Sequence, residues 1–230
     1  MLPLDNAVWT ALTTKQAQHV QSSALARRFP PEMTLLGALA ANTAMAFDSL
    51  AQLIQRDAVT LYFTSLPQIP AGWEIVRAVE LHQMVQEAES PASVSNDSVP
   101  EIIELTPADV PEMSVLYTAT RPGRTLCPRI QKLGQFLGIR EDGKLVAMGG
   151  LRLHLAGYRE ITTVATMPEH EGRGYATAIV MALMARIHTA GNKPFLTVRS
   201  DNTRAVEIYR RLGFKERTLL YSRTIRRAQS

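Results

Sequence analysis

Residues 161–187 read ITTVATMPEHEGRGYATAIVMALMARI, and this stretch decides the fold of the chain. A β-branched, apolar run ends at Thr166 and is followed by a proline, which cannot donate to the hydrogen-bond ladder of a sheet. Two glycines then permit a tight turn. Over residues 173–190 the apolar side chains recur at helical spacing, and the Gly-Asn pair that follows is typical of a helix end. The stretch therefore predicts a strand, a glycine turn and a long amphipathic helix.

The glycine turn has the features of an anion site. Gly172 and Gly174 let the backbone approach a ligand without an intervening Cβ, and Arg173 adds positive charge. The first turn of the following helix presents unpaired N–H groups at the positive end of the helix dipole, which suits a phosphate. The turn is not a P-loop, because no Lys-Ser/Thr pair follows the glycines, and a Rossmann fingerprint would need glycine where Thr177 stands. A purely structural turn remains an alternative at this point.

The rest of the second half alternates between predicted strands and predicted helices. Glu-Asp-Gly at 141–143 is typical of a hairpin turn between two of its strands. We predict strands at 100–105, 135–140, 144–154, 160–166, 195–199 and 214–225, and helices at 106–120, 173–190 and 202–212. This order indicates a mixed α/β or α+β fold.

A polar stretch, QEAESPASVSNDSV at 86–99, separates this half from the beginning of the chain, and we place a linker at 91–99. Within the first segment, residues 1–90, the composition predicts helices over 7–27 and 34–56, the second capped by Thr34. Strands are predicted at Val59–Phe63 and Trp73–Val85. The segment shows no cluster of metal ligands or activated nucleophiles, so we expect it to serve packing, substrate enclosure or dimerisation.

Composition narrows the class of protein. The 230 residues are 46% hydrophobic and 20% charged, as in ordinary globular proteins, and no apolar run approaches the length of a membrane span. The N-terminus lacks the features of a secretory signal. Because Cys127 is the single cysteine, an internal disulfide and a Cys-rich zinc site are excluded. We therefore expect a cytoplasmic protein without a metal.

Charge is distributed unevenly. Residues 1–98 hold 5 Lys/Arg against 9 Asp/Glu, whereas residues 99–230 hold 20 against 12. A basic second half suits a polyanionic ligand such as a nucleotide, CoA or nucleic acid. Nucleic acid is the least favoured of these partners, because no motif interleaves aromatic and basic residues.

A second informative block, PFLTVRSDNTRAVEIYRRLGF, occupies residues 194–214 and reads as a strand that leads into a short helix. Ala205, Tyr209 and Leu212 share one face of that helix, so the phenol of Tyr209 is expected to point into the protein.

Together the two blocks resemble the GNAT N-acyltransferase superfamily, in particular its FR47-like branch, over about residues 100–227. The turn Gln/Arg-x-x-Gly-x-Gly/Ala of that family is matched by EGRGYA at 171–176, with Glu171 in place of the usual Gln or Arg. Its pattern Asn-x-x-Ala-x-x-x-Tyr-x-x-x-Gly-Phe is matched between Asn202 and Phe214. The resemblance implies a GNAT catalytic domain at 100–230 with a mixed, mostly antiparallel sheet. The first segment has the outline of a degenerate acyltransferase half without a CoA site.

The resemblance also implies a function: direct transfer of an acetyl group from acetyl-CoA to a primary amine of a small molecule or peptide, in a ternary complex. Tyr209 matches the family's general acid, and Glu160 is the best-placed base, directly or through water. The expected cofactor-binding residues are Val164, Ala165, Thr166, Glu171, Gly172, Arg173, Gly174, Tyr175, Ala176, Thr177, Asn202 and Tyr209. No metal is implied, and the protein is expected to be a monomer or homodimer.

Several alternatives stay open. Tyr209 is alternatively a core tyrosine beside the cofactor, and Glu160 a carboxylate paired with Arg152 or Arg159. His154 and His170 are less favoured bases, with His170 expected to contact solvent or CoA, and Cys127 has no predicted catalytic partner. The stretch 120–124, TRPGR, is expected near the acceptor pocket, where its charge favours an acidic acceptor. The competing function is that of a CoA-binding protein without turnover.

Overall fold

The computed structural model describes residues 2–87 and 100–228, so the linker predicted at 91–99 lies outside the described residues. The helices are α1 (Ala7–Thr13), α2 (Ala44–Ala51), α3 (Val110–Thr120), α4 (Tyr175–Thr189) and α5 (Thr203–Arg211). The strands are β1 (Gln21–Ser22), β2 (Ala26–Arg28), β3 (Gly37–Leu39), β4 (Val59–Phe63), β5 (Trp73–Val85), β6 (Ile102–Leu105), β7 (Phe136–Glu141), β8 (Lys144–Leu155), β9 (Tyr158–Thr166), β10 (Lys193–Arg199) and β11 (Lys215–Arg227).

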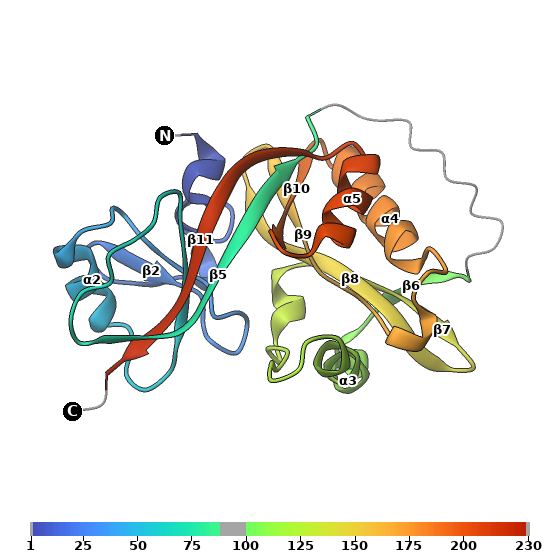
Figure 1. Cartoon of the computed structure of the whole chain (residues 1–230), viewed down its shortest axis with the longest axis horizontal. Helices are drawn as coiled ribbons and strands as arrows, with labels where there is room; N and C mark the ends of the chain where they lie inside the picture. The colour runs from blue at the N-terminus through green and yellow to red at the C-terminus, as the bar shows by residue number, and fades with distance from the viewer. Residues whose placement is uncertain (1, 88–99, 229–230) are drawn as a thin grey trace.

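A large sheet forms the centre of the molecule, with strand order β4-β11-β5-β10-β9-β8-β7-β6 (Figure 1). β9 and β10 run parallel, and the other neighbouring pairs of this sheet run antiparallel. A small sheet of β1, β2 and β3 lies in the first segment. The predicted mixed, mostly antiparallel α/β architecture is confirmed.

Strands of the first segment belong to the large sheet. β5 lies between β10 and β11, and β4 lies on the other side of β11. Figure 1 shows β5 and β11 as two long strands that run from the half holding α4 and α5 to the half holding α2. The sheet thus runs through both segments, and the division into domains at 1–90 and 100–230 stays a prediction.

The two helices predicted in the first segment are too long. α1 ends at Thr13, and residues 26–28 form β2. Likewise, residues 37–39 form β3, and α2 begins only after Thr43, whose side chain accepts a hydrogen bond from the amide of Ala46. β2 and β3 pair with each other and are mostly buried, so tertiary pairing overrides the helical propensity of their Ala- and Leu-rich sequence.

The elements predicted in the second segment are confirmed, with small shifts at their ends. Two positive-φ glycines bound α4: Gly174 at its N-cap, with φ 82°, and Gly191 just beyond its end, with φ 71°. Asn202 caps α5, because its side-chain oxygen accepts from the amide of Ala205 at 3.1 Å. Local signals therefore determine these helix ends.

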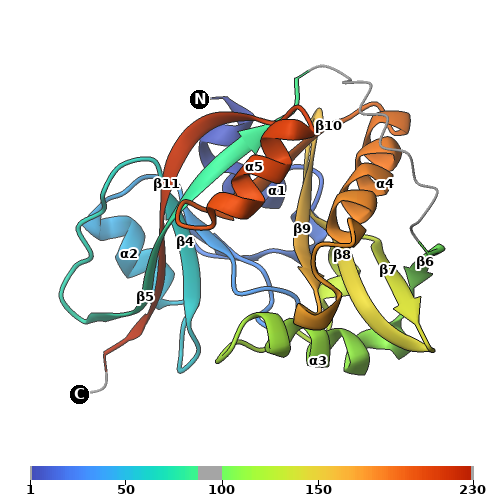
Figure 2. The ribbon, with the colours of Figure 1, turned by 45° about the vertical axis from the view of Figure 1, so that its right-hand side comes forward.

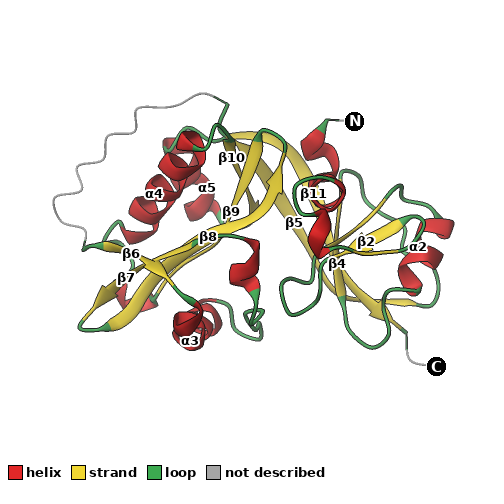
Figure 3. Cartoon of the chain, turned by 180° about the vertical axis from the view of Figure 1, so that it is seen from behind, coloured by secondary structure: helices red, strands yellow, loops and turns green. Residues whose placement is uncertain are grey.

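The two faces of the large sheet carry different helices. α4 and α5 pack on one face, over residues such as Met84, Leu196 and Val198. α1 and α3 pack on the other face, in a cluster that includes Val85 and Phe195. Figures 2 and 3 show α4 and α5 on one side of β8 and β9 and α3 on the other. No helix within the described residues is both long and apolar enough to cross a membrane.

Candidate active site

The sheet opens between β9 and β10. Their parallel pairing joins Tyr158–Ile161 to Lys193–Leu196 and goes no further. Beyond this point β9 continues along β8, past a shift in register that adds one residue to β9 near Thr163. The φ of Thr163 is 58°, a left-handed conformation that is rare for a β-branched residue and marks a β-bulge. The bulge coincides with the point at which β9 separates from β10.

The separated part of β9 presents backbone groups to this opening, and one of them, the carbonyl of Val164, accepts a hydrogen bond from Arg121. The amide of Met167 donates to the carbonyl of Val146 on β8 at 2.8 Å. Because successive residues of a strand direct their polar groups to opposite sides, Thr166 and Val164 direct theirs away from β8 and toward β10. The hydroxyl oxygen of Thr166 is buried without a hydrogen-bond partner among the described residues. This edge fits an extended ligand that carries amide groups.

The glycine turn lies at the end of the same strand. Gly172 and Gly174 have φ of 81° and 82°, and a Cβ added at either would meet no atom within 4 Å. The amide of Ala178 makes the first bond of α4, to the carbonyl of Gly174 at 3.0 Å. The preceding amides of Tyr175–Thr177 therefore have no intrahelical acceptor and face the open side of the turn. These residues fit a pyrophosphate group.

Glu141, at the end of β7, braces the turn. Its carboxylate accepts from the guanidinium of Arg173 at 3.0 Å and from the phenol of Tyr175, and it lies 3.0 Å from Nε2 of His170. The hydrogen bond from Tyr175, followed by the charges of Arg173 and His170, lowers the pKa of Glu141. The side chain of Tyr175 thus has a structural partner, and the charge predicted at Arg173 is partly neutralised. Nδ1 of His170 is buried without a partner among the described residues.

Glu171, which departs from the family's turn, contacts α5. Its carboxylate forms an ion pair with Arg204, and both side chains are largely exposed. Asn202, predicted to bind the cofactor, lies in the same region and uses its side-chain oxygen to cap α5. The structure therefore brings the two sequence blocks together at one end of α4.

Tyr209 lies on α5 beside this region. Its ring is half-buried and packs edge-to-face against Phe214, with ring centroids 6.0 Å apart. Burial raises the pKa of Tyr209 to about 12, and the positive charge of Arg121 opposes this increase. The phenol is therefore a protonated donor at neutral pH, as a general acid must be.

The carboxylate of Glu160 is buried and paired, whereas the predicted general base would need a free carboxylate. Its side chain is fully buried, and its oxygens accept from Nε and Nη2 of Arg152 at 2.9 and 2.7 Å. The backbone amide of Leu153 donates a further bond at 3.3 Å. Pairing with Glu160 raises the pKa of Arg152 against the effect of burial. This geometry agrees with the alternative of an Arg152 pair and does not favour a base that a substrate reaches.

Three arginines that local sequence patterns do not link lie close together, and one of them, Arg121, lies near Tyr209. Arg121 immediately follows α3 and donates from Nη2 to the carbonyl of Val164 at 2.8 Å. Arg124 lies in the same loop, and Arg77 lies on β5 in the first segment. The charge of stretch 120–124 pointed to the loop, but nothing local could pair it with Arg77, 44 residues earlier. Only the sheet brings these parts of the chain together.

Burial shifts the pKa of two of the less favoured candidates. Burial raises the pKa of the Cys127 thiol, which disfavours the nucleophilic thiolate. Burial lowers the pKa of His154, with further contributions from Arg159 and Lys15. Across the described residues, no group of three or more His, Cys, Asp or Glu side chains could hold a metal ion.

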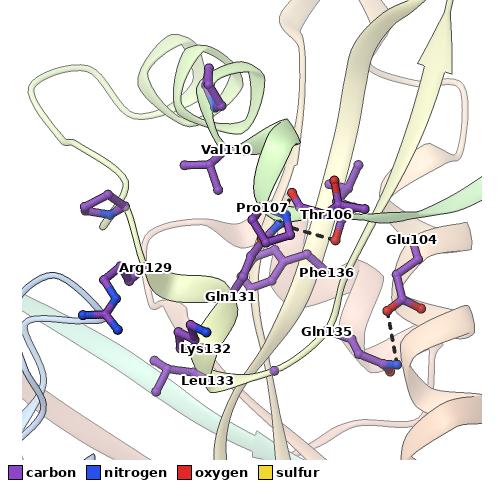
Figure 4. A pocket seen from close by; sticks show the side chains of 14 residues that line it. Glu104, Thr106, Pro107, Val110, Arg129, Gln131, Lys132, Leu133, Gln135 and Phe136 are labelled. Atoms are coloured by element: carbon purple, nitrogen blue, oxygen red, sulfur yellow. Dashed lines mark hydrogen bonds between the residues drawn. The ribbon is translucent and has the colours of Figure 1, made fainter.

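A cavity of about 970 Å³ lies elsewhere, between β6, α3 and β7 (Figure 4). Leu105, Val110 and Phe136 line it together with polar side chains such as Gln131 and Arg129. Gln131 donates to the carbonyl of Thr106 at 2.9 Å, which ties the walls of the cavity together. None of the predicted catalytic or cofactor-binding residues lines this cavity.

Parts of the chain match known proteins. Residues 136–223 match the family model described as FR47-like protein, a region that contains β9, the glycine turn and α5. Mycothiol acetyltransferases from Mycolicibacterium vanbaalenii and Mycolicibacterium gilvum are 35% and 34% identical over 89 and 94 residues, which are 36% and 38% of this chain. The matched regions make up 30% and 31% of those proteins, so the chain spans about a third of the length of these curated relatives.

Solved structures extend the match to the whole chain. A GNAT-family protein from Novosphingobium aromaticivorans is 31% identical with a TM-score of 0.89, and the alignment covers 100% of both chains. A GCN5-related N-acetyltransferase from Kribbella flavida has a TM-score of 0.66 at 14% identity over 100% of this chain and 98% of the other, a likeness of fold alone. Full-length similarity to the Novosphingobium protein, together with the match to the family model, shows that this chain belongs to the GNAT superfamily, in its FR47-like branch.

Proposed function

We propose that the protein is an N-acetyltransferase that transfers the acetyl group of acetyl-CoA to a primary amine of a small molecule or peptide. One observation carries this proposal. The glycine turn, the unpaired edge of β9 and the protonated phenol of Tyr209 occur together around the opening between β9 and β10. The names of the mycothiol acetyltransferases and of the Novosphingobium protein support the reaction class.

Different residues around the opening would bind different parts of acetyl-CoA. The amides of Tyr175–Thr177 would hold the pyrophosphate, with the positive end of the α4 dipole behind them. The backbone of Val164–Thr166 would pair with the pantetheine arm as an added strand. When bound, acetyl-CoA supplies an activated thioester that an amine attacks directly.

Tyr209 acts as the general acid in this proposal. Its Oη would donate a proton to the sulfur of the leaving thiolate, which needs one as the carbon–sulfur bond breaks. The raised pKa, about 12, keeps the proton on the phenol before the reaction. Arg121, of opposite charge to a phenolate, favours loss of that proton when the thiolate forms.

Glu160 has a positioning role in this proposal. Its bidentate bonds join Arg152 on β8 to β9, and the hydroxyl of Thr197 on β10 lies 3.5 Å from the same carboxylate. The pair thus links β8, β9 and β10 just before the point at which β9 and β10 separate. We propose that the Glu160–Arg152 pair maintains the opening. The primary amine then either arrives at the thioester already deprotonated or loses its proton to solvent.

The experiment is a thiol-release screen with acetyl-CoA against amines, amino acids, polyamines and peptide N-termini. Release that depends on one class of amine, with an acetylated product of matching mass, would establish the transferase. If acetyl-CoA binds and no amine releases thiol, a CoA-binding protein without turnover replaces it. A mass change on the protein itself would contradict direct transfer.

A further inference from the structure

A cluster of arginines faces the opening from the side of α3. On β5, Arg77 is four residues from Leu81, which pairs with Arg199 of β10, so Arg77 and Arg199 lie on one face of the sheet. Val85 lies on the same face of β5, in the cluster that α1 and α3 cover. Arg121 and Arg124 lie in the loop after α3, and Arg124 lies within electrostatic reach of Arg77.

A tyrosine holds the loop arginines together. The guanidinium carbons of Arg121 and Arg124 lie 4.9 and 5.8 Å from the ring centroid of Tyr117 on α3. Cation–π contacts of this kind orient guanidinium groups without neutralising them. The N–H donors of both arginines therefore keep their positive charge for another partner.

Within the described residues, no carboxylate forms an ion pair with Arg77, Arg121 or Arg124. Arg199 differs, because Asp201 accepts from it at 2.8 Å. The hydrogen bond from Arg199 lowers the pKa of Asp201 and the charge of Arg77 contributes, so this carboxylate lies within electrostatic reach of Arg77 without forming an ion pair with it. Burial, followed by the charges of Arg124 and Arg199, lowers the pKa of Arg77. Burial also lowers the pKa of Arg121, and Arg124 contributes to the decrease. Like charges are thus held close together and partly desolvated, an arrangement that an anion would stabilise.

The cluster lies where an acceptor must approach. Arg121 contacts the carbonyl of Val164 on the free edge of β9 and lies within electrostatic reach of Tyr209. The glycine turn, where the negatively charged pyrophosphate would bind, lies at the other end of this free edge and has Arg173 and Arg204 beside it. Both of these arginines are paired with carboxylates, Arg173 with Glu141 and Arg204 with Glu171. The arginines on the α3 side have no such ion pair among the described residues, and they are available to a different anion.

Resting on the proposed acetyltransferase function, we propose that Arg77, Arg121 and Arg124 bind a carboxylate of the acceptor, so that the acceptor is an amine that also carries a carboxylate group. Guanidinium groups match the planar carboxylate by bidentate hydrogen bonds. Binding the carboxylate in this cluster would direct the amine of a short molecule toward the opening and Tyr209. An amino acid has this chemistry, and a polyamine does not.

The test compares amines in matched pairs: glycine, L-alanine and L-glutamate against glycinamide, L-alaninamide and L-glutamic acid dimethyl ester, with spermidine as a carboxylate-free amine. We expect kcat/KM to be higher for each acid than for its neutral partner by about tenfold or more, the size of a charged hydrogen bond. Replacing Arg77 and Arg124 together by Gln should raise KM for the acids about tenfold and leave KM for acetyl-CoA within about twofold.

Two variants make the result specific. Arg129→Gln, a nearby exposed arginine that pairs with Glu32, should leave every KM unchanged. Arg124→Gln alone changes an exposed side chain and keeps the test usable if the double variant fails to fold.

Each outcome has a defined meaning. Equal rates for acids and neutral partners, or faster acetylation of spermidine, would overturn the carboxylate site while leaving the acetyltransferase intact. If acetyl-CoA still raises Tm but no amine releases thiol, the proposed acetyltransferase function is wrong, and so is the inference that rests on it.

Discussion

Arg121 donates a hydrogen bond from Nη2 to the carbonyl oxygen of Val164 at 2.8 Å. The contact joins the end of α3 to the strand edge along which the pantetheine arm of acetyl-CoA is proposed to bind. The same guanidinium packs on Tyr117. Burial raises the pKa of Tyr209, and the positive charge of Arg121 opposes this increase. Arg121 therefore borders the proposed acceptor site, the proposed cofactor site and the general acid.

This position predicts a mixed kinetic effect for Arg121→Ala. We expect KM to increase for both acetyl-CoA and the acceptor, each by about tenfold, because the variant removes a charged donor from a shared boundary. Initial rates measured with both substrates varied would show the two increases. For Arg124→Gln we expect an increase in KM for the acceptor only. The same result for Arg121→Ala would place Arg121 in the acceptor site alone.

Tyr209→Phe tests the general acid. The variant keeps the ring that packs on Phe214 and removes the proton donor, so kcat should fall by about 10²-fold or more. The Kd for CoA, measured by calorimetry, should change little. A kcat within twofold of the parent would assign Tyr209 to packing beside the cofactor.

The pKa of Tyr209 also predicts the pH profile. Its value of about 12 lies above the ordinary value, so the proton is present at lower pH and is lost only as the pH rises through about 12. We therefore expect no loss of kcat from this residue between pH 7 and about 10. A decline of kcat in that range that disappears in Tyr209→Phe would show that Tyr209 titrates there, which would contradict its raised pKa.

Gly174→Ala tests the glycine turn. With φ 82°, alanine here adopts a disfavoured conformation that costs about 1–2 kcal/mol, and its methyl group enters the open side of the turn. We expect Kd for CoA to increase by about tenfold or more, because the amides behind the turn are displaced. Gly72→Ala is the matched control, since Gly72 has φ 85° and equally open surroundings far from the site. Equal effects of both on Kd would mean that strain alone is responsible.

Glu160→Gln distinguishes a structural pair from a base. The variant leaves the guanidinium of Arg152 inside the protein without its counter-charge, so the free energy of unfolding should fall by about 3 kcal/mol. Glu104→Gln, which removes an exposed ion pair with Arg186, should cost under about 1 kcal/mol in the same urea titration. Below the unfolding transition, kcat of Glu160→Gln should remain within about tenfold of the parent. A stable variant with kcat reduced a thousandfold would restore Glu160 as the base.

Glu171→Gln tests the residue that departs from the family's turn. Its carboxylate lies beside the proposed phosphate site and pairs with Arg204, so its removal frees one cation and deletes one anion. We expect tighter CoA binding, by about threefold at low salt and less at high salt, because exposed charges are screened. Glu169→Gln, an exposed carboxylate two residues earlier, should change Kd less. Weaker binding of CoA by Glu171→Gln would show that the carboxylate itself contacts the cofactor.

Local signals in the second segment predicted its elements well, because glycines bound α4 and a side-chain cap at Asn202 begins α5. In the first segment such signals misled: residues 26–28 and 37–39 have a helical composition yet form strands that pair with each other. The candidate site shows the same division. Tyr209 and the glycine turn were found from sequence, whereas the pair of Glu160 with Arg152 was only one alternative there, and the complete burial of Glu160 that favours it is a property of the folded chain.

The sequence by itself determined the family, the strand–turn–helix unit at 161–187 and the phenol expected to act as an acid, since these depend on neighbours in the chain. Only the tertiary structure decided that β5 lies between β10 and β11 and that Arg77 therefore shares a face with Arg199 near the loop of Arg121. The physical reason is that strand order and register come from non-local pairing and burial. Residues brought together in this way leave no pattern along the chain.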